Sequence, residues 1–407
     1  LSWQWDMAQI EAKGITDNVV DLMIGKLQKL PTATQEVLRL AACIGADFDL
    51  HTLAIVCEKP VQSLFADLTP ALESGLILPT SDLNSDLLKQ YKFLHDRVQQ
   101  AAYCLIDENQ KNDIHLRIGR LLWQNTSAEL LTEEIFKIVN HLNLVLYLIT
   151  EPTERNEIAN LNLIAGKKAK SATGYNSAIA YLTAGIALLG NEGWQNQYEL
   201  TLNLYLAAVE ATYLKAEFTQ MEKLAEVVLQ KAINILDRVK IYEIKILACQ
   251  LQSKQLEAIS IGLKVLRLLG ISFPKSPSQL DIERRLAETK SNINKKPIDE
   301  LIALPVMSDR NKLAALRILA SVYPPSFQAA PQLLPLIICE MVNLSLNYGN
   351  APLSAFAYAL YGLILCGVVG DIECGYQFEK LSLILLAQFN SKELEAKIFE
   401  IVGVHIR

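Results

Sequence analysis

Hydrophobic positions in the first hundred residues recur mostly three and four apart, the spacing of one face of a helix. Val19, Met23, Leu27 and Leu30 follow this spacing, with Asn18 as a possible cap and Pro31 as the stop. Thr32 and Gln35 have the spacing of a capping box and begin a second helix through Ile44. Shorter helices are expected around 50–57 and 61–74.

Two short apolar runs then have the character of strands. Leu76 to Pro79 is the first, Tyr91 to Leu94 is the second, and the polar stretch 81–89 separates them. Helices followed by a two-stranded ribbon are typical of a winged-helix domain, which we assign to residues 14–105. Residues 1–13 are then the end of a linker.

Beyond Asp96 strand signals nearly vanish, and helical faces recur. Faces that begin at Tyr175, Phe218 and Gln255 lie roughly 40 residues apart, as in arrays of helical hairpins. The predicted fold class is therefore all-α, a small winged-helix part followed by a tetratricopeptide-like helical-repeat solenoid. We place the repeats at 106–270 and 311–407, with a joint at 271–310 that is rich in proline and charge.

The stretch 318–370 has one charged residue, Glu340, and the uncharged run 351–370 is long enough to span a bilayer. The alternative is a pair of helices buried in a helical array. Lys/Arg clusters do not flank the run, so the usual orientation signal is missing. We predict a core helix pair within 351–370 and no membrane span.

Composition narrows the class of protein. Hydrophobic residues are 51% and charged residues 20%, which excludes a disordered chain, and the net charge of -6 without a long basic run argues against nucleic acid as a partner. Seven cysteines without a CxxC motif indicate buried free thiols in a reducing compartment, so we expect a cytoplasmic protein. The first residue is Leu1, and the chain ends in an apolar periodic stretch, so we expect an internal piece of a longer polypeptide.

The search for catalytic motifs is negative. The sequence contains no GxxxxGK[ST], GxGxxG, HExxH or GxSxG motif, and its five histidines lack metal-ligand spacing. We therefore predict no catalytic residue, metal or cofactor in this segment.

One string retains functional interest. A strand ends in His95-Asp96-Arg97 and leads into a helix that Asp96 is expected to cap. His95 either ties the strand end to a neighbouring backbone group or, with Arg97, senses a nucleotide phosphate bound to a neighbouring ATPase domain. Histidine suits the second task because it donates hydrogen bonds and can carry charge near neutral pH.

A family resemblance adds to this pattern. The string 91–103 resembles the end of the winged-helix element in signal-transduction ATPases of the AAA/STAND type. With it, several further strings resemble the large multidomain serine/threonine kinases common in cyanobacteria: Trp3 to Asp6, Thr16 to Met23, Lys26 to Pro31, Ala41 to Gly45, Gly75 to Pro79, Leu161 to Gly166 and Gly349 to Pro352.

The resemblance implies an order of domains: kinase, ATPase, this helical region, a GAF domain and a sensor histidine kinase. ATP and Mg²⁺ would belong to the parent domains, and this segment would be a non-catalytic regulatory unit that contacts proteins and neighbouring domains, in an oligomeric state that the sequence leaves open. The alternative is a winged-helix DNA-binding regulator. That reading needs a basic recognition helix, and the predicted helix 61–74 has no Lys or Arg.

Overall fold

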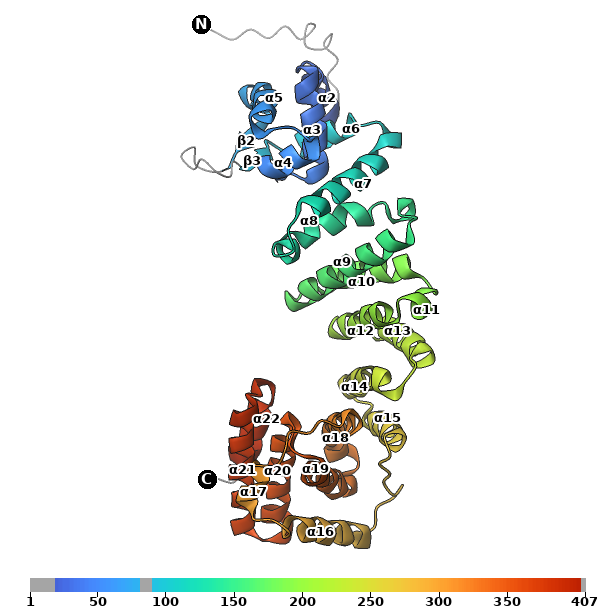
Figure 1. The fold of residues 1–407 in the computed structure, drawn as a ribbon, viewed down its shortest axis with the longest axis vertical. Coiled ribbons are helices and arrows are strands. Elements are labelled where there is room, and N and C mark those ends of the chain that lie inside the picture. The colour runs from blue at the N-terminus through green and yellow to red at the C-terminus, as the bar shows by residue number, and fades with distance from the viewer. Residues whose placement is uncertain (1–18, 81–89, 404–407) are drawn as a thin grey trace, which may run out of the picture. The chain divides into compact units, whose positions relative to one another are not determined.

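The computed structural model describes residues 19–80 and 90–403. They form mostly helices and a small sheet, grouped into two compact units, Leu1–Leu200 and Thr201–Arg407 (Figure 1). The prediction of a predominantly helical protein is confirmed. The linker at 1–13, the cap Asn18 and the stretch 81–89 lie outside the described residues. The predicted boundaries at 105 and 270 fall inside the two units and stay predictions.

The first unit begins with short helices and three strands. In chain order these are α2 (Val19–Leu27), α3 (Thr32–Ile44), β1 (Asp47–Asp49), α4 (Leu50–Cys57), α5 (Val61–Glu73), β2 (Ile77–Pro79), β3 (Gln90–Phe93) and α6 (Asp96–Cys104). The helices and two of the strands lie where the hydrophobic pattern predicts them. The sequence did not predict β1, because three residues are too few to display a period.

The sheet has the order β1-β3-β2, with both pairs antiparallel. Phe48 of β1 pairs with Tyr91 of β3, and their stacked rings lie 6.0 Å apart. On the other side of β3, Ile77 pairs with Phe93. These four side chains are buried and form one core with α3, α4 and α5, so the sheet packs against these three helices.

The predicted capping box at the start of α3 is wrong. Helix α3 follows Pro31 without a side-chain cap. Instead, the side-chain amide of Gln35 donates to the carbonyls of Gln28 (3.1 Å) and Leu30 (2.8 Å). Gln35 therefore satisfies carbonyls in the turn after α2, which is where a helix end leaves acceptors unpaired.

The rest of the first unit is helical: α7 (Glu108–Asn125), α8 (Leu131–Asn143), the 3-10 helix η1 (Leu146–Leu148), α9 (Pro152–Ser171), α10 (Tyr175–Leu189) and α11 (Gly193–Asn196). The buried Asn162 exchanges amide hydrogen bonds of 2.7 and 2.9 Å with Asn143, which ties α9 to α8. Gly166 lets α9 approach α10, because a Cβ atom there would lie 2.5 Å from Cγ of Leu182.

Helices continue through the second unit. They are α12 (Tyr198–Leu214, which begins just before it), α13 (Phe218–Lys231), α14 (Ile235–Leu251), α15 (Gln255–Leu268), α16 (Gln279–Ile293), α17 (Ile298–Ile302), α18 (Arg310–Ala329), the 3-10 helix η2 (Pro331–Leu333), α19 (Leu334–Tyr348), α20 (Pro352–Ile364), the π-helical turn η3 (Leu365–Val369), α21 (Ile372–Phe389) and α22 (Lys392–Gly403). Two prolines, Pro324 and Pro325, lie inside α18.

The segment 271–310 carries α16 and α17, and both are bound to the helices that follow. The side-chain amide of Asn343 in α19 donates to the hydroxyl of Thr289 in α16 at 2.9 Å. The side-chain amide of Asn350 donates to the carbonyl of Leu301 in α17 at 2.7 Å. Since Thr289, Leu301 and Asn350 are buried, these bonds hold the segment on the second unit.

In the part of the chain that the structure describes, one helical stretch, Pro352–Val369, is long and apolar enough to cross a membrane; 61% of it is buried inside the protein. The prediction of a helix pair within 351–370 is wrong. These residues form one helix, α20, and its π-helical end, because no break occurs before Gly370, whose φ is 81°. The packing partner is α21, whose Phe378 meets the ring of Tyr361 edge-on at 5.1 Å.

Candidate functional site at the junction of α4, α6, α7, α8 and α9

The predicted site residues His95 and Arg97 lie at the exposed start of α6. His95 has extended backbone angles and caps the helix: its Nδ1 accepts from the backbone N–H of Arg97 at 3.2 Å. The expected cap, Asp96, is the first residue of the helix instead. Arg97 donates to the side chain of Gln100 at 2.8 Å. The two residues therefore share one helix start, and their proposed role toward nucleotide stays a prediction.

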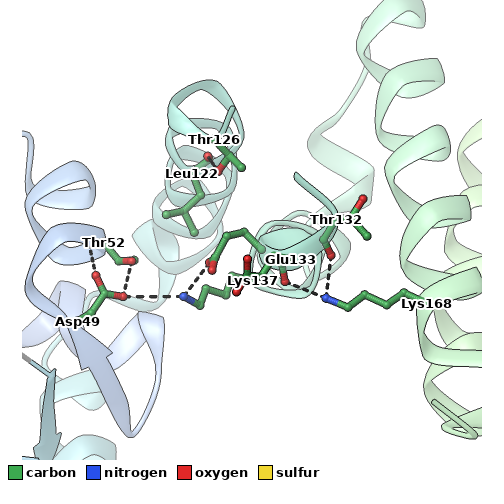
Figure 2. Close-up of polar contacts among 9 residues, drawn as sticks. Asp49, Thr52, Leu122, Thr126, Thr132, Glu133, Lys137 and Lys168 are labelled. Atoms are coloured by element: carbon green, nitrogen blue, oxygen red, sulfur yellow. Dashed lines mark hydrogen bonds and ion pairs between the residues drawn. The ribbon is translucent and has the colours of Figure 1, made fainter. Parts of the chain in front are cut away.

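A second polar group begins at the end of β1, the strand that pairs with β3. Asp49 caps α4 by accepting from the backbone N–H and the hydroxyl of Thr52, both at 2.6 Å. The Lys137 ammonium of α8 lies 3.8 Å from Asp49 Oδ2 and 2.7 Å from Glu134 Oε2 (Figure 2). Asp49 therefore links the sheet to α4 by a cap and to α8 by charge.

The opposite side of α8 is held by α9. Lys168 donates to the backbone carbonyls of Thr132 (2.7 Å) and Glu133 (2.9 Å) in the first turn of α8, as Figure 2 shows. The same ammonium lies 4.9 Å from the centroid of the Phe136 ring, within cation–π range. Helix α8 is thus held on two sides: its own Lys137 reaches Asp49, and Lys168 of α9 binds its first turn.

A buried pair of histidines joins α7 to α8 nearby. Nδ1 of His115 lies 2.9 Å from Nδ1 of His141, and the rings stack with centroids 5.2 Å apart. Nε2 of His115 lies 3.0 Å from the hydroxyl of Tyr103 in α6. In the neutral pair one Nδ1 donates and the other accepts, so the two rings carry opposite tautomers.

Burial also sets the charge state of this pair. Burial, together with the neighbouring His115, lowers the pKa of His141 to about 4. It lowers the pKa of His115 as well, with help from the positive charge of Lys111. Both rings are therefore neutral near pH 7, the state that the Nδ1–Nδ1 hydrogen bond requires.

Two arginines of α7 complete the junction. Arg117 donates from Nε to Glu58, the residue after α4, at 3.1 Å. Arg120 forms a two-point ion pair with Glu154 of α9, at 2.7 and 2.8 Å. Bidentate pairs of this kind fix orientation as well as distance.

No local pattern predicts the histidine pair, because its members are 26 positions apart in the chain. Each lies on the buried side of its helix, beside Leu116 or Leu142, and a buried polar residue of this kind needs a partner. That need is the signal that could have led from one histidine to the other. Within the described ranges, no group of three or more His, Cys, Asp or Glu side chains could hold a metal ion. The contacts of the junction are hydrogen bonds and ion pairs that join neighbouring helices.

Comparison with known proteins gives one relationship. Over 96% of its length the chain is similar, at 25% identity, to a protein of Dictyostelium discoideum named hybrid signal transduction histidine kinase G. The chain spans 14% of the length of that relative. No family model matches the chain, and no solved structure matches it. The similarity supports a relationship to signal-transduction kinases.

Proposed function

We propose that this chain is a non-catalytic regulatory segment of a multidomain signalling protein. It couples an upstream ATPase and serine/threonine kinase to a downstream sensor histidine kinase. The observation that carries the proposal is the junction, in which the sheet and α4 are joined to α8 by Asp49 and Lys137 and α8 is joined to α9 by Lys168.

The architecture supports this assignment. The order of elements from α3 to β3, with the sheet order β1-β3-β2, is compatible with a winged-helix domain. The successive antiparallel helices that follow are compatible with a tetratricopeptide-like solenoid, in which each hairpin contacts its neighbours and can pass a displacement along. The relationship to a hybrid histidine kinase is compatible with a role in signal transduction.

A path for coupling follows from the strand register. His95 follows β3 after one intervening residue, Leu94, and Gln90 of β3 pairs with Asp49 of β1. A nucleotide phosphate bound at His95 and Arg97 would change the position of β3, then of Asp49, and so the contact with Lys137. Surface ion pairs are worth at most about 1 kcal/mol. The buried histidine pair and the arginine pairs must therefore supply part of the coupling, which is about 1–3 kcal/mol in typical allosteric proteins.

Partners, cofactors and location belong to the same proposal. The segment binds proteins and neighbouring domains of its own polypeptide in the cytoplasm, and it holds no nucleotide of its own. The DNA-binding alternative receives no support from α5, since none of the charged residues on that helix is Lys or Arg. A gel-shift assay that detects sequence-specific DNA binding would favour the alternative.

The test uses the full polypeptide that carries this segment. Lys137→Glu places a negative charge beside Asp49 and Glu134, and we expect it to change the nucleotide dependence of histidine autophosphorylation roughly fivefold or more. Lys167→Glu is the matched control, because this exposed lysine lies on α9 beside Lys168. Equal melting temperatures show that both variants fold. An unchanged nucleotide dependence in Lys137→Glu would contradict the coupling role.

A further inference from the structure

Helix α21 has an apolar stripe on the face that points away from the core. Ile372, Tyr376 and Ile384 are 70%, 43% and 46% exposed, at positions i, i+4 and i+12 of the helix. Position i+8 is Lys380, whose ammonium lies 4.4 Å from the centroid of the Tyr376 ring. The four residues therefore form one i+4 ridge, which winds about 40° around the helix at each step.

The stripe continues beyond the start of the helix. Val368 and Val369, in the π-helical turn before α21, are 69% and 46% exposed. The opposite face of α21 buries Phe378, Leu381 and Leu385 against the second unit. Contiguous exposed apolar surface of this kind, unlike a single exposed residue, is typical of a docking face.

The order of residues in the stripe is self-complementary. If two copies of α21 cross antiparallel at the angle of about −50° that lets their i+4 ridges interdigitate, around a two-fold axis near position 378, Ile372 faces the partner's Ile384. Tyr376 then faces the partner's Lys380, so the cation–π contact seen within one chain also forms between chains. A two-fold interface requires such a pattern, in which residue i contacts j and j contacts i.

The charges agree with the same pairing. Glu373 and Lys380 are the charged residues on the exposed face of α21. In the antiparallel arrangement Glu373 lies within one helical turn of the partner's Lys380, and no like charges face each other. Few side chains take part, and a small interface gives weak association.

We propose that the face formed by Val368, Val369, Ile372, Tyr376, Lys380 and Ile384 binds a second copy of this chain through antiparallel pairing of α21. This inference does not depend on the proposed function. It assigns a homodimer contact to the second unit, with an affinity weak enough that dimers form as the local concentration rises.

Sedimentation equilibrium of the whole chain over a wide concentration range tests the contact. We expect a reversible monomer–dimer equilibrium, and Ile384→Glu is expected to weaken it roughly tenfold or more, because a carboxylate would face the partner's Ile372. Leu256→Glu on α15 is the matched control: Leu256 is 69% exposed, lies away from the stripe, and its replacement should leave dimerisation unchanged. Circular dichroism verifies that each variant is folded.

A charge exchange tests the register. Lys380→Glu should weaken the dimer, and the double variant Glu373→Lys/Lys380→Glu should recover most of the lost affinity, since the partner's charges are then opposite again. A monomer at every concentration, or a dimer that Ile384→Glu leaves intact, overturns the proposal. If the chain is a monomer at every concentration, the stripe would instead be a binding face for a different protein.

Discussion

His115 and His141 share one hydrogen-bonded proton between Nδ1 atoms that lie 2.9 Å apart. Both rings are buried, and both pKa values lie below that of a free histidine. The unfolded chain therefore binds protons more readily than the folded chain between pH 6.5 and about 4. By linkage, the pair stabilises the fold above this range, and the stabilisation is lost as the pH falls through it.

We expect the free energy of unfolding to fall between pH 7 and pH 4.5, by up to about 1.4 kcal/mol per pH unit for each histidine. Urea titrations at several pH values measure it. His141→Gln should flatten the dependence, while His51→Gln, which replaces an exposed histidine, should leave it as in the unmodified chain. A pH profile that His141→Gln does not change would contradict the buried pair as its source.

The second prediction for single residues concerns the effect of replacing two glycines on stability. Gly349 has φ of 101°, and a Cβ atom there would lie 2.1 Å from the carbonyl oxygen of Pro305. We expect Gly349→Ala to destabilise the fold by about 1–3 kcal/mol. Gly25→Ala is the control, since a Cβ atom there meets nothing within 4 Å and the helix interior gains about 0.5–1 kcal/mol. Thermal melts of the two variants should shift in opposite directions.

The elements of this chain differ in how far the sequence predicts them. Helices such as α10 and α15 have long apolar periods, and their predicted starts agree with the structure. The strand β1 has no such period, since it owes its existence to pairing with β3, forty residues away along the chain. The caps show the same limit. Whether His95 or Asp96 caps α6 depends on which residue keeps the extended backbone of the strand, and neighbouring side chains do not reveal this.

The prediction for a single helix concerns a buried residue of α20. Leu360 of α20 is fully buried in the hydrophobic core of the second unit. Leu360→Asp would bury an unpaired charge at a cost of several kcal/mol, so we expect loss of the second unit's fold and rapid proteolysis of residues 310–403.

Val368→Asp is the matched control, because the Val368 side chain is 69% exposed and should accept a carboxylate without unfolding. The same preparations are tested for partition into membranes. A Leu360→Asp variant that folds, together with unmodified chain that stays in the membrane pellet after a salt wash, would favour a membrane span for 352–369.

For the whole molecule, the sequence shows which catalytic motifs are missing, but it does not show which distant residues meet in the folded protein. The lack of catalytic motifs can be judged from the sequence alone, and it led to the prediction of a non-catalytic segment, which stays a prediction. The junction cannot be predicted in this way, because Asp49, Lys137 and Lys168 come together through folding and belong to three separate elements. Similarity to a hybrid histidine kinase supports the signalling context, over a small share of that protein.

The 407-residue chain alone should not bind ATP. The sequence has no phosphate-binding loop, and the proposed contact of His95 and Arg97 is with a nucleotide held by another domain. Isothermal titration calorimetry with ATP and Mg²⁺ is expected to show no saturable heat. Micromolar binding by the 407-residue chain would contradict this prediction and would make the segment itself a nucleotide-binding unit.

The two roles of His95 can be separated in the parent polypeptide, because its Nδ1 caps α6 and leaves Nε2 for a phosphate. His95→Ala removes both functions, whereas His95→Asn keeps a good capping side chain and removes the imidazole. If His95 senses nucleotide, both variants should weaken ADP retention by about 1–3 kcal/mol, the value of a hydrogen bond to a charged group. If its role is structural, His95→Asn should retain ADP like the unmodified protein, and His95→Ala should lower only the melting temperature. Fluorescent ADP displacement and thermal melts of the two variants distinguish these outcomes.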